Sequence, residues 1–417
     1  MSEISTTPLT AADGTPLKKK LAQAMFRSRV RAVGLVLPLL GFVLASFVFP
    51  ILALMWQGVY NDTFERLMPN LTEELRIWDG VSEPTEEMYA LLVLDLKQNR
   101  ADRTIGKVAS RVNQELSGTR SLFTSTARKA EKIEPPYRES LVKIKKKWGK
   151  LEVWQAMKLT NESLTPGYYA TSLDKRYTVD QGFIERDKKR QIYTKLFIRT
   201  LFISGSVMFL CLLLGYPVAY LLATLPLKYS NLLMIMVLLP FWTSLLVRTT
   251  AWIAILQSQG VVNDLLVWVG ITADDSRFSL IYNMTGTIIA MTHILLPFMI
   301  LPLYSVMKTI PPSYMRAARS LGATPTLALI RVYMPQTVPG IGAGGLLVFI
   351  LAIGYYITPA LVGGQDGQLI SNMIAYHMQK SLNWSLAAAL GGILLGGVLV
   401  LYWAYDRIIG IDNMKLG

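Results

Sequence analysis

A short polar stretch between two long apolar runs reads PPSYMRAARSLGATP over residues 311–325. Its two prolines bar the preceding chain from continuing as a helix, and Ser313 is of the type that caps the free amides of a new one. Gly322 can adopt the left-handed conformation that ends a helix. The stretch therefore predicts a two-turn helix with defined ends. A second helical segment is expected to begin at Thr324-Pro325 and to stop before Pro335.

Two small side chains, Ala317 and Ala318, lie in the middle of this predicted helix. Small side chains let another protein approach the helix backbone closely, as a docking element requires. The alternative that composition allows is an amphipathic turn resting on lipid headgroups. The local chemistry predicts the helix and leaves both interpretations of its role open.

Six apolar runs flank this stretch or lie further out, and each is long enough to cross a hydrocarbon layer of about 30 Å. The 417 residues are 52% hydrophobic and only 17% charged, which favours a membrane protein. Continuously apolar runs exclude a β-barrel, whose strands alternate. The predicted spans are Ala32–Trp56, Thr200–Ala223, Leu232–Leu256, Gly286–Tyr304, Gly340–Leu361 and Trp384–Tyr402.

Positive charge is distributed unevenly about these runs. Lys and Arg residues precede the first run and recur in every second connection, with Arg407 and Lys415 after the last run. Because such residues stay on the cytoplasmic side, both termini are expected in the cytoplasm. The first run is longer than the roughly 7 to 15 apolar residues of a cleavable signal, so we expect an uncleaved anchor.

The runs divide the chain into five expected parts. Residues 85–132 are rich in helix formers and contain no proline, so the long segment after the first span is expected to be mostly helical. The expected parts are a basic cytoplasmic tail (1–31), the first transmembrane helix (32–56), a periplasmic insertion (57–199), a core transmembrane domain (200–407) with a cytoplasmic loop (307–339), and a cytoplasmic C-terminus (408–417).

Several functions are not expected. Cys211 is the only cysteine, and the only two histidines, His293 and His377, lie far apart, so neither a redox site nor a metal site is predicted. The chain lacks a Gly-x-x-x-x-Gly-Lys-Ser/Thr segment, so it is not expected to hydrolyse ATP. The cytoplasmic loops and tail hold much of the +14 net charge, which topology explains without nucleic acid. We expect no catalytic residue and no bound cofactor.

Residues 312–341 resemble the cytoplasmic EAA loop of ABC importer permeases. The family pattern is Glu-Ala-Ala, three residues, Gly, about nine residues, and a hydrophobic-x-Leu-Pro ending. The chain matches it with Ala317, Ala318, Gly322, Val332 and Pro335, followed by Gly340. The resemblance implies a coupling helix that sits in a groove of an ATPase subunit. The coupling residues it implies are Ser313, Arg316, Ala317, Ala318, Leu321, Gly322 and Pro335.

Two positions depart from the family pattern. Arg316 replaces the Glu, and Met334 replaces the Leu before the proline. The first departure also removes an acid from the helix start, a loss of roughly 0.3 to 1 kcal/mol of dipole stabilisation. Docking by shape is still expected, but a Glu-mediated contact to the ATPase is not.

A narrower resemblance covers the membrane part. GYPVAY (215–220), PFWTS (240–244) with RT (248–249) and AW (251–252), and ITPALVGG (357–364) are similar to the first permease of spermidine/putrescine-type importers. The resemblance implies an all-α polytopic protein with six transmembrane helices in the type I ABC importer permease fold. It implies import of a polyamine or related solute by alternating access; opines or other small organic solutes are the alternative. The insertion at 57–199 departs from shorter family members, and either docks a solute-binding protein or packs on the membrane core.

A translocation path is expected where helices break, because freed backbone groups survive in a membrane only inside protein or beside water. Pro217, Pro240, Pro297, Pro302 and Pro359 are expected to interrupt spans. Arg248, inside the third span, costs about 2.5 kcal/mol or more there and is expected to face the bundle interior or to reach the external surface beside Trp252. The expected path residues are Pro217, Pro240, Trp242, Thr243, Arg248, Tyr355, Thr358 and Pro359.

The resemblance also implies an assembly in the bacterial inner membrane. Its expected partners are a cytoplasmic ABC ATPase dimer that binds ATP and Mg, a second homologous permease subunit, a periplasmic solute-binding protein and membrane lipid. Two other classes remain as alternatives. A six-helix cation channel would need a pore loop and usually a regular series of charges in one span, and a membrane sensor would need a cytoplasmic signalling domain.

Overall fold

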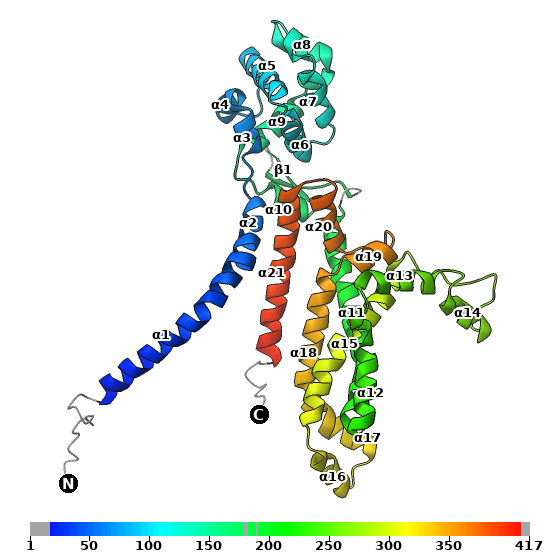
Figure 1. Cartoon of the computed structure of the whole chain (residues 1–417). Helices are drawn as coiled ribbons and strands as arrows, with labels where there is room; N and C mark the ends of the chain where they lie inside the picture. The colour runs from blue at the N-terminus through cyan, green and yellow to red at the C-terminus, as the bar shows by residue number, and fades with distance from the viewer. Residues whose placement is uncertain (1–16, 179–181, 189–190, 410–417) are drawn as a thin grey trace. The chain divides into compact units, whose positions relative to one another are not determined.

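The computed structural model describes residues 17–178, 182–188 and 191–409 (Figure 1). The predictions for residues 1–16 of the basic tail and for 410–417, including Lys415, lie outside the described residues. The described chain is mostly helical and divides into two compact units, with the boundary in the sequence between Trp56 and Gln57. This confirms the predicted all-α class.

The first unit is one long helical segment. It consists of α1 (Leu17–Val43), a π-helical turn (Leu44–Val48) and α2 (Phe49–Gln57). Its 30 residues from Ser28 to Gln57 are apolar and long enough to cross a membrane, and none of the most apolar window is buried within the protein. The length and composition of this segment confirm the first predicted span.

The insertion folds as a small helical domain that carries a β-hairpin. Its helices are α3 (Thr63–Leu67), α4 (Pro69–Ile77), α5 (Glu86–Ala101), α6 (Ile105–Glu115), α7 (Arg120–Ala127), α8 (Tyr137–Ile144), α9 (Leu151–Asn161) and α10 (Gly167–Ser172). The antiparallel strands β1 (Lys175–Thr178) and β2 (Gly182–Glu185), which sequence reasoning missed, pair Lys175 with Glu185. Trp148 and Trp154 are fully buried at the centre, edge-on to Phe123 and Tyr89 respectively.

Local signals explain where these helices begin and end. Thr85 caps α5 by accepting the Met88 amide, and Met88, Leu92 and Leu96 form its buried face. The expected helical stretch 85–132 is nevertheless divided into several helices. Residues in the left-handed region lie in two of the connections, Arg103 after α5 and Gly118 between α6 and α7. The mostly helical prediction is confirmed, and two of the breaks contain a residue with positive φ.

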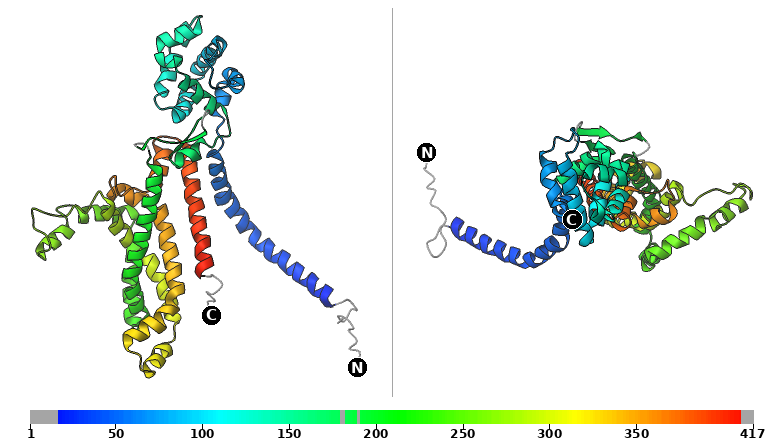
Figure 2. Two further views of the ribbon diagram at one scale, coloured as in Figure 1. Left: turned by 180° about the vertical axis from the view of Figure 1, so that it is seen from behind. Right: turned by 90° about the horizontal axis from the view of Figure 1, so that it is seen from above.

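The remaining helices form the membrane domain. They are α11 (Tyr193–Thr224), α12 (Leu227–Leu238), α13 (Leu245–Leu256), α14 (Val261–Trp268), α15 (Met284–Thr309), α16 (Pro312–Ser320), α17 (Pro325–Ala328), α18 (Met334–Gly354), α19 (Ile357–Val362), α20 (Ile370–Gln379) and α21 (Trp384–Ile409). α11, α15 and α18 run side by side in front and rear views (Figures 1 and 2). Their shared core includes Val207, Cys211, Met291, Met299 and Val348.

Six helical segments of the described chain are long and apolar enough to span a membrane, as predicted. The third predicted span, Leu232–Leu256, is wrong as one continuous helix. It consists of α12, a 3-10 turn from Leu239 to Trp242, and α13, and the six candidate segments include Leu245–Trp268 in its place. Pro240 lies in the 3-10 turn, and Ser244 caps α13 by accepting the Val247 amide, so a new helix starts there.

The fifth predicted span, Gly340–Leu361, is also discontinuous. α18 ends at Gly354, Tyr355 has extended backbone, and the short helix α19 carries Pro359 in its first turn. By contrast, the expectation that Pro217, Pro297 and Pro302 interrupt helices is wrong. α11 runs through the first and α15 through the other two, as membrane helices can when neighbouring groups satisfy the freed carbonyls.

Candidate functional site

The predicted docking helix is α16, which connects α15 to the next helical segment (Figure 1). Tyr314, Ala317 and Leu321 recur at helical spacing on one face, and all three are exposed; Leu321 is 90% exposed. Ala318 differs from expectation, because it is buried at 9% exposure. Of the two alanines, only Ala317 is therefore accessible, between two exposed apolar side chains.

The start of α16 corrects one prediction. The helix begins at Pro312, with Pro311 at the cap position and no side chain capping it, so Ser313 is not the cap. Pro312 occupies the first helical position because its fixed φ suits that place and its missing amide costs nothing there. Ser313 is thereby moved into the first turn, where its side chain is exposed.

The end of α16 confirms the role expected of Gly322. The glycine has a φ of +86°, and its amide donates to the Arg319 carbonyl at 3.0 Å. The Ala323 amide donates to the Ala318 carbonyl at 3.1 Å. This pair of hydrogen bonds is a Schellman motif, which satisfies the last carbonyls of the helix and turns the chain sharply.

The second helical segment begins as predicted but does not stop before Pro335. Thr324 caps α17 by accepting the Leu327 amide at 3.3 Å. The chain then continues through a π-helical turn, Leu329–Tyr333, directly into α18, which starts at Met334. Pro335 lies in the first turn of α18, where the hydrogen-bond pattern changes and a missing amide is tolerated. The segment after α16 is thus helically continuous with the spanning helix α18.

A hollow of 760 Å³ opens on the other side of α16 from Leu321. α16 contributes Met315, Arg316 and Arg319 to it, and α15 contributes Lys308. The Lys308 ammonium reaches the carbonyl of Ala223 at the end of α11, at 3.4 Å. Three cations therefore share this hollow, and no acidic residue lines it among the described residues.

The predicted path residues fall into two groups. Tyr355, Thr358 and Arg248 lie together, since the Thr358 hydroxyl is 3.2 Å from that of Thr249 in α13 and Arg248 lies close enough to act electrostatically on Tyr355 and His293. The Arg248 Nε is buried and has no hydrogen-bond partner among the described residues. Pro359 is buried one residue after Thr358.

The other predicted path residues do not join this group. Trp242 and Thr243 are exposed at the break between α12 and α13, and Trp242 is 79% exposed. Pro240 is half-buried in the 3-10 turn before them, whereas Pro217 is exposed on α11. Trp252, expected as the surface neighbour of Arg248, instead donates its indole N–H to His293 at 3.1 Å.

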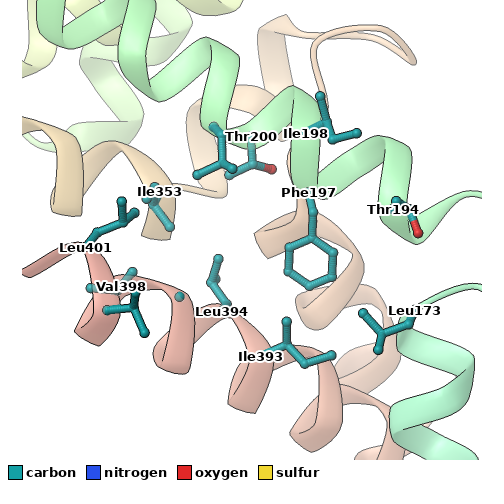
Figure 3. Close-up of a pocket in the computed structure, with 13 residues that line it drawn as sticks. Leu173, Thr194, Phe197, Ile198, Thr200, Ile353, Ile393, Leu394, Val398 and Leu401 are labelled. Atoms are coloured by element: carbon teal, nitrogen blue, oxygen red, sulfur yellow. The ribbon is translucent and has the colours of Figure 1, made fainter. Parts of the chain in front are cut away.

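A pocket of 480 Å³ lies between α11, α18 and α21 (Figure 3). Figure 3 shows the Phe197 ring of α11 directed toward Ile393 and Leu394 of α21. Thr194 and Thr200 are the only polar side chains among the described residues that line it, and the Thr200 hydroxyl already bonds the Leu196 carbonyl and the Ile370 amide. The pocket is therefore lined mostly by apolar side chains, which do not recognise a polar solute.

Sequence reasoning missed a buried polar contact between α11 and α20. The Tyr193 hydroxyl is 2.9 Å from His377 Nε2, and His377 Nδ1 is 2.8 Å from the Ser381 hydroxyl. These partners are distant in sequence, so no local pattern could have revealed them. The carboxylate of Asp174 caps the same end of α11 by accepting the amides of Tyr193 and Thr194.

Acidification is expected to weaken this contact. Burial lowers the pKa of His377 below its ordinary 6.5, so the folded protein holds the ring neutral. As pH falls below 6.5, the unfolded chain binds the proton first, and stability decreases until the folded-state pKa is passed. The thermal midpoint of purified protein should drop by roughly 2 °C or more between pH 7.5 and 5.5 through this group. His377→Gln should reduce that drop; an unchanged pH dependence in this variant would contradict the prediction.

The chain is similar in sequence to a family of membrane transport proteins. Residues 212–409 match the family model described as binding-protein-dependent transport system inner membrane component. The spermidine/putrescine transport system permease proteins PotB of Salmonella typhimurium (strain SL1344) and Escherichia coli (strain K12) are 35% identical over 221 residues. These matches cover 52% of this chain and 76% and 80% of the relatives.

Further similarities are more distant. The inner membrane ABC transporter permease protein YdcU of Escherichia coli (strain K12) is 32% identical over 228 residues, which are 52% of this chain and 71% of the relative. Among solved structures, a bacterial alginate ABC transporter bound to a pentasaccharide-loaded periplasmic protein aligns with a TM-score of 0.43 at 22% identity, covering 54% of this chain and 81% of that chain. By its match to PotB over more than two thirds of that protein, the chain belongs to the binding-protein-dependent transport system inner membrane components, as a permease subunit of an ABC importer whose ATP is hydrolysed by a partner subunit.

Proposed function

We propose that this permease imports a small organic solute of the polyamine type. The observation that carries the proposal is the 35% identity over 221 residues to the spermidine/putrescine permeases PotB, together with the family model that matches residues 212–409. The ATPase and the solute-binding protein are the partners of such importers. A second homologous permease completes the membrane pore, lipid surrounds it, and ATP and Mg bind to the ATPase subunits.

The proposed coupling element is α16. An exposed apolar face built from Tyr314, Ala317 and Leu321 supports this role, because removing apolar side chains from water against a partner protein lowers the free energy. The Schellman end at Gly322 and the unbroken path from α17 into α18 support transmission of force, since a push on α16 acts on a spanning helix. In this proposal both termini and α16 lie in the cytoplasm and the insertion lies in the periplasm.

The proposed path passes the group formed by Arg248, Tyr355 and Thr358. It is supported by the breaks on either side of this group, before α13 and between α18 and α19, which expose backbone polar groups within the membrane domain. ATP-driven closure of the ATPase subunits would move α16 and, through α18, the break at Tyr355. The solute would then gain access from one side at a time.

A second candidate solute carries a carboxylate, as opines do. The observation that favours it is Arg248, whose Nε is buried without a partner, in a domain where no acidic residue occurs over residues 276–365. A polycation would pass this charge at an electrostatic cost, whereas a carboxylate would pair with it. The two candidates differ in the sign of the solute charge.

One measurement tests the proposal and separates the candidates. The complex is reconstituted in liposomes with the ATPase, the second permease and the binding protein encoded beside it, and ATP hydrolysis is measured across polyamines, opines, amino acids and sugars. Stimulation only by binding protein loaded with a polyamine is the expected result. Stimulation only by a carboxylate solute would favour the second candidate, and failure to assemble with any ATPase would overturn the coupling proposal.

A further inference from the structure

The segment of the membrane domain around α16 carries positive charges but no negative ones. Residues 276–365, which include α15, α16, α17 and α18, contain no Asp or Glu. The exposed charges of this segment near α16 are Lys308, Arg316, Arg319 and Arg331. Arg316 and Arg319 form no ion pair within the part of the chain that the structure describes, and Lys308 reaches only a backbone carbonyl.

Geometry brings three of these cations together. Arg316 and Arg319 are one turn apart on α16, so they lie on the same side of the helix, and both line the 760 Å³ hollow with Lys308. Met307, Met315 and Tyr333 supply apolar walls, which reduce the screening of charge by water. Three like charges in one partly apolar hollow repel one another, and an entering anion would relieve that repulsion.

We propose that an acidic side chain of the ATPase subunit enters this hollow and pairs with Arg316 and its neighbours when α16 docks. The inference rests on the proposed coupling role of α16. Its occupant follows from charge complementarity: the three cations that line the hollow, on the side of α16 away from Leu321, have no acidic neighbour there among the described residues. Apolar contact on Leu321 supplies affinity, and the ion pair supplies orientation and partner choice.

This arrangement inverts the charge at one position of the family pattern. Arg316 stands where the EAA loop of the family carries Glu, so an ATPase that suits a Glu-bearing loop would place the wrong charge against this permease. The expected consequence is selectivity: this permease assembles with its own ATPase and discriminates against ATPases of permeases with the family Glu.

The test measures association of the purified ATPase with the full permease complex in nanodiscs, at low and high salt. Arg316→Glu is expected to weaken binding by about tenfold or more, and added salt should weaken the wild-type complex but not this variant to the same extent. A Glu in the first half of a helix favours the helix dipole, so the variant should keep α16 folded. Reversing the matching acid of the ATPase groove to Arg is expected to restore binding.

Matched variants separate the possible failures. Arg331→Glu makes the same charge reversal at another exposed arginine, which does not line the hollow, so it should leave binding within about twofold. Leu321→Ala tests the apolar face independently of charge. If Leu321→Ala weakens binding but Arg316→Glu does not, the acidic partner is wrong while the coupling role stands. If neither variant changes binding, the coupling role of α16 itself fails.

Discussion

Replacing Gly364 with alanine is expected to remove most folded protein from the membrane. A Cβ atom at this position would lie 2.2 Å from the carbonyl oxygen of Tyr282 and 2.8 Å from its carbonyl carbon, so the backbone would have to move. The glycine also has a φ of +55°, which costs a residue with a Cβ roughly 1 to 2 kcal/mol. Overpacking adds about 1 to 3 kcal/mol, and the sum approaches the whole stability of a marginal domain.

The neighbourhood of Gly364 makes this clash hard to relieve. Tyr282 is itself in the left-handed region, and its amide donates to the Val362 carbonyl at 2.7 Å, two residues before the glycine. Gly363 and Gly367 both lie against the Thr287 hydroxyl near the start of α15, so the adjacent turns are equally close-packed. A shift at Gly364 would therefore disturb the junction that joins α19 to α15.

The matched control for Gly364 is Gly354→Ala at the end of α18. Its added Cβ would have no heavy atom within 4 Å, and its φ is not positive, so the variant should behave as wild type. The measurement is the yield of monodisperse protein in detergent together with its thermal midpoint. A Gly364→Ala protein with the yield and midpoint of wild type would show that the junction is not close-packed as described.

The ends of α16 show how much local chemistry can predict. The end of α16 at Gly322 and the start of the next helix at Thr324-Pro325 depend on residues only a few positions away, so both follow from sequence alone, and both are confirmed. Ser313 fails for an equally local reason. Two neighbouring residues compete for the helix start, and Pro312 suits the first helical position, which moves the serine inside.

The breaks in the spans could not be located from composition. Hydropathy is continuous across Leu232–Leu256, and it reports how apolar a segment is, not whether its axis is straight. The presence of a proline does not predict where a helix breaks, since Pro240 lies in a break and Pro297 lies inside an unbroken helix. Residue type does not distinguish these two prolines, and only the fold shows which of them lies in a break.

The candidate path was predicted only in part, for the same reason. The sequence identifies Arg248 because a charge in a span is rare, and it names Thr358 among the path residues without a separate argument. Their grouping with Thr249 and Tyr355 depends on contact between α13 and the start of α19, which are about a hundred residues apart in sequence: Thr249 and Thr358 are separated by 109 positions. His293 was dismissed as a metal ligand, and its contact with Trp252 had no sequence signal.

Replacing Gly322 with valine is expected to abolish transport while leaving the permease in the membrane. An added side chain would meet no atom within 4 Å, so the cost is conformational: at a φ of +86° a β-branched residue is strained by about 1 to 2 kcal/mol or more. Relief requires the turn after α16 to open, which would break the hydrogen bonds to Arg319 and Ala318 and tilt α16. Under the proposed coupling role, ATP hydrolysis would then continue with little or no solute uptake.

Gly270→Val is the matched control for this uncoupling. Gly270 also has a positive φ, +79°, and open space around it. It lies after α14, however, outside the loop that carries α16. Both variants carry the same backbone strain, so a general loss of stability would affect them alike. Transport per ATP hydrolysed, measured in liposomes at equal permease content, should fall about tenfold or more for Gly322→Val and stay near wild type for Gly270→Val. Equal losses in both variants would trace the defect to strain alone, and normal transport by Gly322→Val would contradict the placement of the coupling helix at α16.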